Sequence, residues 1–211
     1  VQIGRTHGQH AVPLTFGFAV AGYVSRLGEC VVNLERLTNE LLGMCSGAVG
    51  ACNASSLIVD NPKSFEREVL AELGLKQVKH STQVMPTESF IRLFSEITIA
   101  TGVFANIADD MRHLQRSEIG EVGEAFASTQ VGSSTMPHKK NPISFENVKS
   151  LWKIIMPRLA TLFMDQISEH QRDLTGSAST RTHSEIIAYA FAAVKRLTRA
   201  MSGLALDYER M

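Results

Sequence analysis

Three short polar segments combine residue types that could carry out acid–base chemistry on an anionic substrate. The first is GRTHGQHAVP, residues 4–13, which places His7 and His10 among glycines. The second is HSTQ, residues 80–83, and the third is GSSTMPHKKNP, residues 132–142. A glycine-led loop with two lysines can close over an anion, because backbone N–H groups and ammonium groups converge on it. These residues indicate anion binding with acid and base catalysis, and a solvated connection is the alternative interpretation of the lysine-rich loop.

The histidines do not form an obvious metal site. His7 and His10 are three residues apart, but no further cluster of ligands accompanies them in the sequence. We therefore expect no metal or other cofactor, and we interpret His10 as a structural residue. The remaining histidines outside the lysine loop are expected on the surface or in packing: His80, His113, His170 and His183.

Long amphipathic helices are predicted beside these segments. Apolar residues recur every seven positions over residues 13–42, 86–118 and 187–204, and residues 147–164 predict a further helix interrupted by Pro157. A shorter helix is predicted from Asn61 and Pro62 to a stop at Gly74. Strand signals are nearly absent and no boundary divides the chain. The expected fold is an all-α long-helix bundle forming one domain over residues 1–211.

Composition excludes several classes of function. With 211 residues and 44% hydrophobic content the chain can bury a substantial core. Its 21 basic and 21 acidic residues cancel, which argues against nucleic acid or an anionic membrane as a partner. The cysteines form no CxxC pair and suit a reducing compartment, so we expect a cytoplasmic protein. No uninterrupted apolar run suggests a membrane span.

The lysine-rich loop resembles the signature loop of the fumarase/aspartase superfamily, which has the form GSSxMPxKxNP. GRTHGQHAVP and STQ are similar to two further conserved regions of that superfamily, in the same order. The resemblance covers essentially the whole chain and implies the long-helix bundle of the superfamily's central domain. It also implies that the N-terminal and C-terminal domains of a longer enzyme are absent from this sequence.

Members of the superfamily remove a proton beside a carboxylate and expel a nitrogen or oxygen leaving group, in most cases with release of fumarate. Such a reaction needs a base, stabilisation of a dianionic carboxylate and an acid for the leaving group. The resemblance implies that Ser133 is the base, activated by the loop, and that His7 is the general acid. It further implies that substrate is bound by Thr82, Gln83, Ser134, Lys139 and Asn141.

A fourth segment indicates which branch of the superfamily is involved. QRDLTGSASTR, residues 171–181, is similar to the segment with which adenylosuccinate lyases bind a nucleotide phosphate. Arg172, Ser177 and Arg181 reproduce its spacing, and two guanidinium groups with a hydroxyl suit a phosphate dianion. The alternative is that Arg172 pairs with a neighbouring acid on a helix surface. The stretch ISFEN, residues 143–147, also resembles this branch.

The implied reaction is β-elimination of fumarate from adenylosuccinate, and from the succinyl-aminoimidazole carboxamide nucleotide of purine biosynthesis. The segment MPTESF, residues 85–90, departs from the branch, because Thr87 and Glu88 stand where many members carry arginine and aspartate. Two alternatives therefore stay open: another lyase or carboxymuconate cycloisomerase-like enzyme of the superfamily, and an inactive structural paralogue. The resemblance also implies a homotetramer whose active sites are shared between subunits.

Overall fold

The computed structural model describes residues 1–125, 135–136 and 138–211. The chain divides into two compact units, which are described separately. Unit 1 comprises Val1–Cys30, Ile99–Ile155 and Ala188–Met211, and unit 2 comprises Val31–Thr98 and Met156–Ile187. Every boundary between the units falls within a helix, which is why no change of composition marks it in the sequence.

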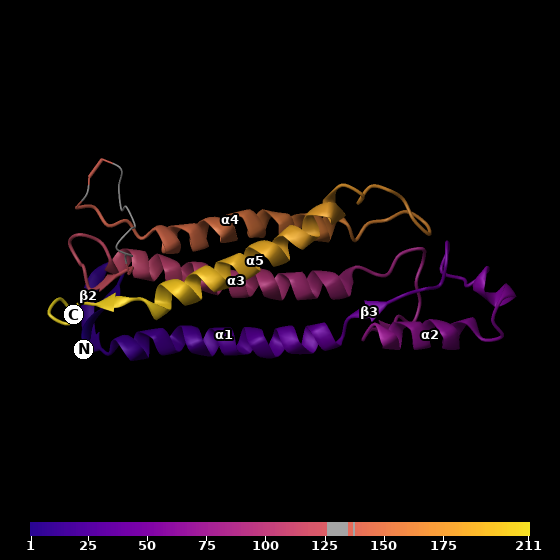
Figure 1. Cartoon of the computed structure of the whole chain (residues 1–211), viewed down its shortest axis with the longest axis horizontal. Coiled ribbons are helices and arrows are strands. Elements are labelled where there is room, and N and C mark those ends of the chain that lie inside the picture. Colours follow the sequence, from indigo (N-terminus) through magenta and orange to yellow (C-terminus); the bar gives the residue numbers. More distant parts are fainter. Residues whose placement is uncertain (126–134, 137) are drawn as a thin grey trace. The chain divides into compact units, whose positions relative to one another are not determined.

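Helices account for most of the described chain, and the all-α expectation is confirmed. The long helices are α1 (Phe16–Asn39), α3 (Glu88–Leu114), α4 (Ile143–Met164) and α5 (His183–Ser202), as labelled in Figure 1. The shorter helix α2 spans Pro62–Glu72. Its first turn is capped by the Asn61 side chain, which accepts a hydrogen bond from the backbone N–H of Ser64 at 3.0 Å, as the Asn-Pro pair predicted.

Pro157 does not interrupt α4, contrary to our expectation from the sequence. A proline in a helix interior removes one backbone hydrogen bond and disfavours the helix by about 3 kcal/mol. Burial on either side of it offsets this cost, since Ile155 is fully buried in unit 1 and Leu162 is 2% exposed in unit 2. The helix therefore continues through the proline.

The segment GRTHGQHAVP forms a β-hairpin, whereas its polar sequence suggested an irregular stretch. Strands β1 (Gln2–Thr6) and β2 (Gln9–Leu14) are antiparallel, and Thr6 pairs with Gln9. The two turn residues, His7 and Gly8, have φ angles of 55° and 73°. A two-residue hairpin turn of this kind needs positive φ at both positions, and histidine is one of the side chains that tolerate it.

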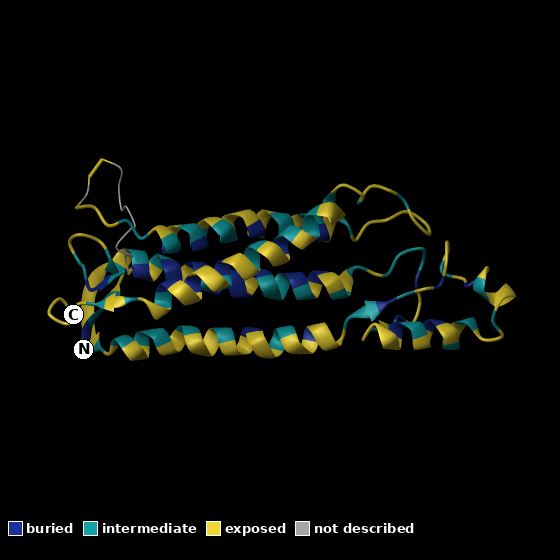
Figure 2. Cartoon of the chain, viewed as in Figure 1, coloured by how far each residue is buried: buried dark blue, intermediate teal, exposed yellow. Residues whose placement is uncertain are grey.

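The core of unit 1 lies around the C-terminal half of α3. Figure 2 shows that buried residues gather along α3, while α1 carries mostly exposed and intermediate ones. The buried cluster is completed by residues of α4, α5 and the short strand β5 (Val122–Gly123), which pairs with β6 (Ala205–Leu206). Its members are Val103, Ile107, Ala108, Met111, Val122, Phe145, Val148, Leu197 and Ala200.

An ion pair fixes the hairpin to the rest of unit 1. The Arg5 guanidinium of β1 donates to both carboxylate oxygens of Glu121, at 3.1 and 2.5 Å. The Glu121 side chain is 2% exposed and that of Arg5 is 20% exposed. Glu121 lies just before β5, so this contact joins the first strand to the segment that follows α3.

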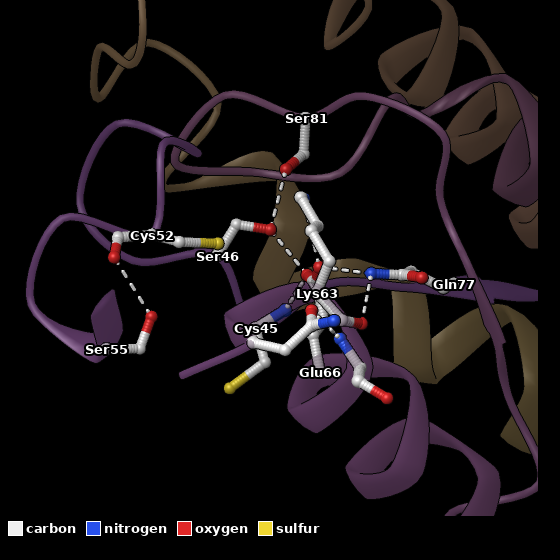
Figure 3. A network of polar contacts seen from close by, with 10 residues as sticks. Cys45, Ser46, Cys52, Ser55, Lys63, Glu66, Gln77 and Ser81 are labelled. Carbon is white, nitrogen blue, oxygen red and sulfur yellow. Dashed lines mark hydrogen bonds and ion pairs between the residues drawn. The ribbon is translucent and has the colours of Figure 1, made fainter. Parts of the chain in front are cut away.

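In unit 2 the short parallel strands β3 (Leu42–Gly43) and β4 (Lys76–Gln77) lie at the two ends of a segment that contains α2 and the 3-10 turn η1 (Ser55–Leu57). Glu66 of α2 is fully buried beside them. Its carboxylate accepts hydrogen bonds from Cys45 N at 2.7 Å, Ser46 Oγ, Gln77 Nε2 at 2.6 Å and Lys63 Nζ at 3.1 Å. Figure 3 shows these donors converging on Glu66 from separate segments.

The surroundings of Glu66 keep its carboxylate ionised. Burial alone would raise its pKa, but the hydrogen bonds from Ser46, Cys45, Gln77 and Lys63 outweigh burial and lower the pKa from 4.5 to about 2. A buried carboxylate with several donors is stable only while it stays charged, because its protonated form would leave donors without an acceptor.

Within the described residues, α3 is the one helix long and apolar enough to cross a membrane by composition, and 44% of its apolar window is buried inside the protein. The buried residues of α3, among them Ala108 and Met111, belong to the core of unit 1. We therefore interpret α3 as a core helix.

We predict that Arg5→Met lowers the free energy of unfolding by about 3 kcal/mol or more, because it leaves the buried Glu121 charge unpaired. Urea unfolding at neutral pH measures this loss. The double variant Arg5→Met/Glu121→Leu should recover much of it, since the buried charge is then gone. A double variant as unstable as Arg5→Met would contradict this account of the pair.

We predict a second effect on stability that depends on pH. The folded pKa of Glu66 lies below its ordinary value, so its contribution is present above pH 4.5 and is lost as the pH falls toward 2. The full contribution is about 3 kcal/mol. Urea midpoints measured between pH 7 and pH 2 should fall more steeply for the parent than for Glu66→Gln. Parallel pH profiles for the two proteins would argue against a charged Glu66.

Candidate functional site

The HSTQ segment lies in unit 2 in the stretch that precedes α3. Thr82 forms a tight local turn, in which its Oγ1 donates to the carbonyl of Val84 at 3.2 Å and accepts from the N–H of Val84 at 3.3 Å. The backbone N–H of Gln83 donates to the carbonyl of Gln171 at 3.0 Å. This last bond joins the HSTQ segment directly to the start of QRDLTGSASTR.

The structure therefore brings together two of the four segments that the sequence singled out. Arg172 and Ser177 line a cavity of about 270 Å³, and Val84, Met85 and Thr87 line it as well. The remaining lining is largely apolar, with Phe90, Ile91, Leu162, Ile167 and Leu174. Arg181 lies farther along, in the exposed 3-10 turn η2 (Ser179–Thr182). A cavity that is lined by an arginine and by several apolar side chains suits a ligand with both an anionic group and an apolar part.

The acid next to Arg172 has other partners. Asp173 accepts hydrogen bonds from Thr175 Oγ1 at 2.6 Å, Thr175 N at 2.9 Å and Glu169 N at 2.7 Å. The hydrogen bond from the Thr175 side chain, followed by those from the two backbone N–H groups, lowers the pKa of Asp173. Asp173 thus shapes the turn that presents Arg172 to the cavity.

An acid and a histidine that we did not single out as site residues also line this cavity. Asp165 Oδ1 accepts from Ser179 Oγ at 2.6 Å, and its Oδ2 lies 3.3 Å from Nε2 of His183. Both side chains are largely buried, at 11% and 21% exposure. The His183 ring also packs against Phe94, with 5.9 Å between ring centroids. No motif marks this pair in the sequence, because Asp165 and His183 are eighteen residues apart and both lie outside the four polar segments.

The two departures in MPTESF lie at the same place. Thr87 lines the cavity, and Glu88 begins α3, where its Oε1 accepts from Gln166 Nε2 at 3.4 Å. A carboxylate in the first turn of a helix is also stabilised by the positive end of the helix dipole. Two residues that differ from the branch pattern therefore stand beside the Arg172 cavity.

In unit 1, His7 lies at the exposed tip of the β1–β2 hairpin. The turn holds its backbone at positive φ, and the Arg5–Glu121 pair fixes the strand that leads to it. His10 is exposed on β2, where it pairs with Arg5 in the hairpin register. The hairpin thus presents His7 on a two-residue turn between hydrogen-bonded strands.

The end of the lysine loop is also in unit 1. Lys139 and Asn141 line a cavity of about 750 Å³ together with residues from the C-terminal end of α3. Its basic and imidazole groups are Arg112, His113, Arg116, His138, Lys139 and Lys140. The serines assigned to this loop, Ser133 and Ser134, lie outside the described residues.

The side chain of Gln115, which directly follows α3, joins Glu124 to the lysine loop. Gln115 Oε1 accepts from the backbone N–H of Glu124 at 2.9 Å, and its Nε2 donates to the carbonyl of Lys140 at 3.1 Å. The Glu124 carboxylate accepts from Ser144 N at 2.9 Å and from Ser144 Oγ. Glu124 therefore occupies the N-terminal end of α4, where backbone N–H groups would otherwise attract an external anion.

Arg112, which lines the same cavity, is held by acids. Arg112 pairs with Asp109 at 2.6 Å and lies 3.8 Å from Glu146, while Asp109 also binds Lys149 at 2.5 Å. Burial would raise the pKa of Asp109, but the hydrogen bond and charge of Lys149, together with Arg112, lower it. Glu146 belongs to the ISFEN stretch, so its contact with Arg112 joins that stretch to α3.

The predicted site residues thus fall into two groups. Thr82, Gln83, Arg172, Ser177 and Arg181 belong to unit 2, whereas His7, Lys139 and Asn141 belong to unit 1. Sequence reasoning missed the residues that support both groups, chiefly Glu66, Gln115 and Glu124. Glu66 and Gln115 lie on predicted helices, where a single charged or amide residue usually indicates a solvated face, and Glu124 lies outside every predicted helix and motif.

Comparison with known proteins identifies a family. The family described as "Lyase" matches residues 1–156. An adenylosuccinate lyase of Archaeoglobus fulgidus is 35% identical over 213 residues, covering 100% of this chain and 47% of that protein. One of Thermotoga maritima is 39% identical over 180 residues, covering 85% of this chain and 40% of that protein. The chain therefore spans less than half the length of these curated relatives.

Solved structures show the same fold. A 3-carboxy-cis,cis-muconate lactonizing enzyme of Pseudomonas putida has a TM-score of 0.87 and 28% identity, covering 99% of this chain and 46% of that one. A fumarate lyase of Mesorhizobium sp. BNC1 has a TM-score of 0.85 at 24% identity, covering 100% of this chain and 46% of that one. Because the family match spans most of the chain and these neighbours share its helical fold, the chain belongs to the lyase family, within the fumarase/aspartase superfamily.

Proposed function

We propose that residues 1–211 are the central helical domain of an adenylosuccinate lyase, a carbon–nitrogen lyase that releases fumarate. The observation that carries this proposal is the hydrogen bond between Gln83 N and Gln171 O, which sets the HSTQ segment beside Arg172. A substrate-positioning motif and a phosphate-binding motif are then neighbours, as a nucleotide substrate requires. The similarity to adenylosuccinate lyases over the whole chain supports the same substrate class.

The phosphate is bound by Arg172, Ser177 and Arg181 in this proposal. A guanidinium binds a phosphate with two parallel hydrogen bonds, and the exposed side chains of Arg172 and Arg181 can reach an incoming dianion. The apolar wall formed by Phe90, Leu162 and neighbouring residues suits the flat purine. Thr82 and Gln83 then position the succinyl part of the substrate. Their segment is hydrogen-bonded to Gln171, the residue before Arg172.

The chemistry is a β-elimination that needs no redox partner. Ser133, as the base, removes a proton from the carbon beside a carboxylate of the succinyl group, and the electron pair passes into that carboxylate as a dianion. The C–N bond then breaks, the electron pair of that bond goes to nitrogen, and His7 supplies the proton that nitrogen takes up. The products are fumarate and adenosine monophosphate.

Stabilisation of the dianion falls to side chains of the loop. The Glu124 carboxylate lies at the N-terminal end of α4, where it accepts a hydrogen bond from the backbone N–H of Ser144. Lys139 and Asn141 line the adjacent cavity and carry donors suited to a carboxylate. Ser134 adds a hydroxyl in the same loop.

We propose a cytoplasmic homotetramer with active sites shared between subunits. Large apolar side chains of α1 are exposed in the single chain, including Phe18 at 74%, Val24 at 64% and Val31 at 62%. Members of the heptad pattern that stay exposed are available to pack against another copy. Sharing would let His7, Ser133 and Gln83 from different subunits complete one site.

A second candidate is a carboxymuconate cycloisomerase-like activity, favoured by the 0.87 TM-score to the Pseudomonas putida enzyme. Such a substrate has no phosphate, so Arg172 and Arg181 would have no anionic group of that kind to bind. An inactive structural paralogue is the third reading, and turnover by the full-length gene product excludes it.

The main prediction concerns fumarate release from adenylosuccinate by the full-length gene product, followed through the ultraviolet change of the purine. Ser133→Ala should lower kcat by roughly 100-fold or more, since a positioned base contributes about 10²–10⁴. Arg196→Ala, an exposed arginine of α5, is the control and should leave turnover unchanged. A folded parent protein that releases no fumarate from adenylosuccinate would refute the proposal.

A further prediction isolates the phosphate site. Arg181→Ala should raise KM for adenylosuccinate by roughly 10–100-fold, as expected for loss of a charged hydrogen bond. Its KM for the nucleoside that lacks the phosphate should change little. If both KM values rise equally, Arg181 supports the fold rather than the phosphate.

A further inference from the structure

We propose that Glu66 and Ser46 are positioning residues for the HSTQ segment, acting on it through the hydroxyl of Ser81. The inference depends on the proposed function, since it concerns how that substrate-binding segment is held. None of the three residues is assigned to substrate contact: Glu66 is fully buried, Ser46 is 1% exposed and Ser81 is 5% exposed.

The connection is a chain of side-chain contacts. Ser46 Oγ donates to Glu66 Oε1, and Ser81 Oγ lies 3.3 Å from Ser46 Oγ. Figure 3 shows Ser46 between the Glu66 carboxylate and the Ser81 hydroxyl. Ser81 directly precedes Thr82 and Gln83, so the chain runs from α2 into the substrate-binding segment.

The charge of Glu66 sets the direction of both hydrogen bonds. An ionised carboxylate only accepts, so Ser46 must donate its one proton to Glu66. The Ser46 oxygen then accepts, and Ser81 must be the donor to it. The low pKa of Glu66 keeps this orientation in force throughout the neutral range. A neutral amide at position 66 would remove that constraint, because its NH₂ group donates.

The backbone of the segment is constrained from a second side. Gly50 has φ of +75°, and a Cβ added there would overlap the carbonyl oxygen of Ser81 and lie 2.7 Å from that of Thr82. The loop that carries Gly50 is closed by a hydrogen bond from Cys52 N to Ser46 O at 2.8 Å. Ser46 thus contacts the segment through its side chain and also anchors the loop that packs on the segment's backbone.

The position of the HSTQ segment also affects the cavity that Arg172 lines. Gln83 N donates to Gln171 O, and Arg172 follows at once. A shift of Ser81 therefore moves Gln83 and loosens the bond to Gln171. We expect loss of the Ser81 contact to weaken substrate binding more than the chemical step, because no residue of this chain of contacts touches the reacting atoms.

The network also supplies a matched control. Lys63 of α2 donates from Nζ to the other carboxylate oxygen, Glu66 Oε2, at 3.1 Å, and this hydrogen bond involves neither serine hydroxyl. Lys63→Met removes one donor from Glu66 and leaves Ser46 and Ser81 in place. Ser81→Ala removes the hydroxyl that donates to Ser46 but keeps all four donors to Glu66, so this variant should fold.

The experiment compares Ser46→Ala, Ser81→Ala, the double variant and Lys63→Met in the full-length enzyme. KM and kcat for adenylosuccinate are measured, together with hydrogen exchange of the peptide that covers residues 79–85. Each serine variant should raise KM by about 5-fold, the equivalent of one hydrogen bond, with kcat nearly unchanged. The double variant should be no worse than either single one, because the two hydroxyls act in series. Exchange at the Gln83 amide should quicken in the serine variants and not in Lys63→Met.

Three outcomes would overturn the inference. The first is exchange and KM in Ser81→Ala that match the parent, and the second is a rise in KM for Lys63→Met as large as that for Ser81→Ala. Faster exchange with an unchanged KM would also overturn it, since the segment would then be held by the network without serving the substrate. If the parent does not turn over adenylosuccinate, the proposed function is wrong whatever the exchange data show. The positioning role of the network is then tested by exchange alone, and an unaltered exchange rate in Ser81→Ala would contradict it.

Discussion

A carboxylate removed from water must be surrounded by donors, and this requirement organises the segments that carry the candidate chemistry. Three glutamates are buried in the described residues: Glu66, Glu121 and Glu124, with exposures of 0%, 1% and 8%. Each gathers hydrogen bonds from a segment far away in sequence. Because an unpaired buried charge costs several kcal/mol, the segments that supply the donors are held in place as firmly as the core itself.

Each buried glutamate supports a different part of the candidate site. Glu121 binds Arg5 and so fixes the strand that leads to His7. Glu124 binds Ser144 at the start of α4, just beyond the lysine loop. Glu66 binds Ser46, which reaches Ser81 beside Thr82 and Gln83. Among the described residues, those proposed to contact substrate are exposed or half-buried, while the three glutamates that help to place them are buried. This is the arrangement expected of a preorganised site.

The apolar residues of the long helices are either buried within the chain or left exposed on its surface. On α3 the pattern is largely satisfied within the chain, since Ile107, Ala108 and Met111 are buried. On α1 the apolar residues at Val24 and Val31 stay exposed. The same heptad spacing therefore leads to a core in one helix and to an uncovered surface in another, and the difference depends on which neighbours the fold places beside each helix.

The sequence by itself determined the helices and the location of the polar motifs, because both depend on local spacing. Heptad repeats predicted α1, α3 and α5 within a few residues at most ends, and Asn61 with Pro62 predicted the start of α2. Only the tertiary structure decided that His7 lies on a hairpin turn, that α4 passes through Pro157, and that Gln83 meets Gln171. It also revealed Glu66 as the acceptor for four donors. These features depend on partners that are far away in the sequence. Such partners offset a local cost, which is a buried charge at Glu66, a missing N–H at Pro157 and a positive φ at His7. Local spacing carries no information about them.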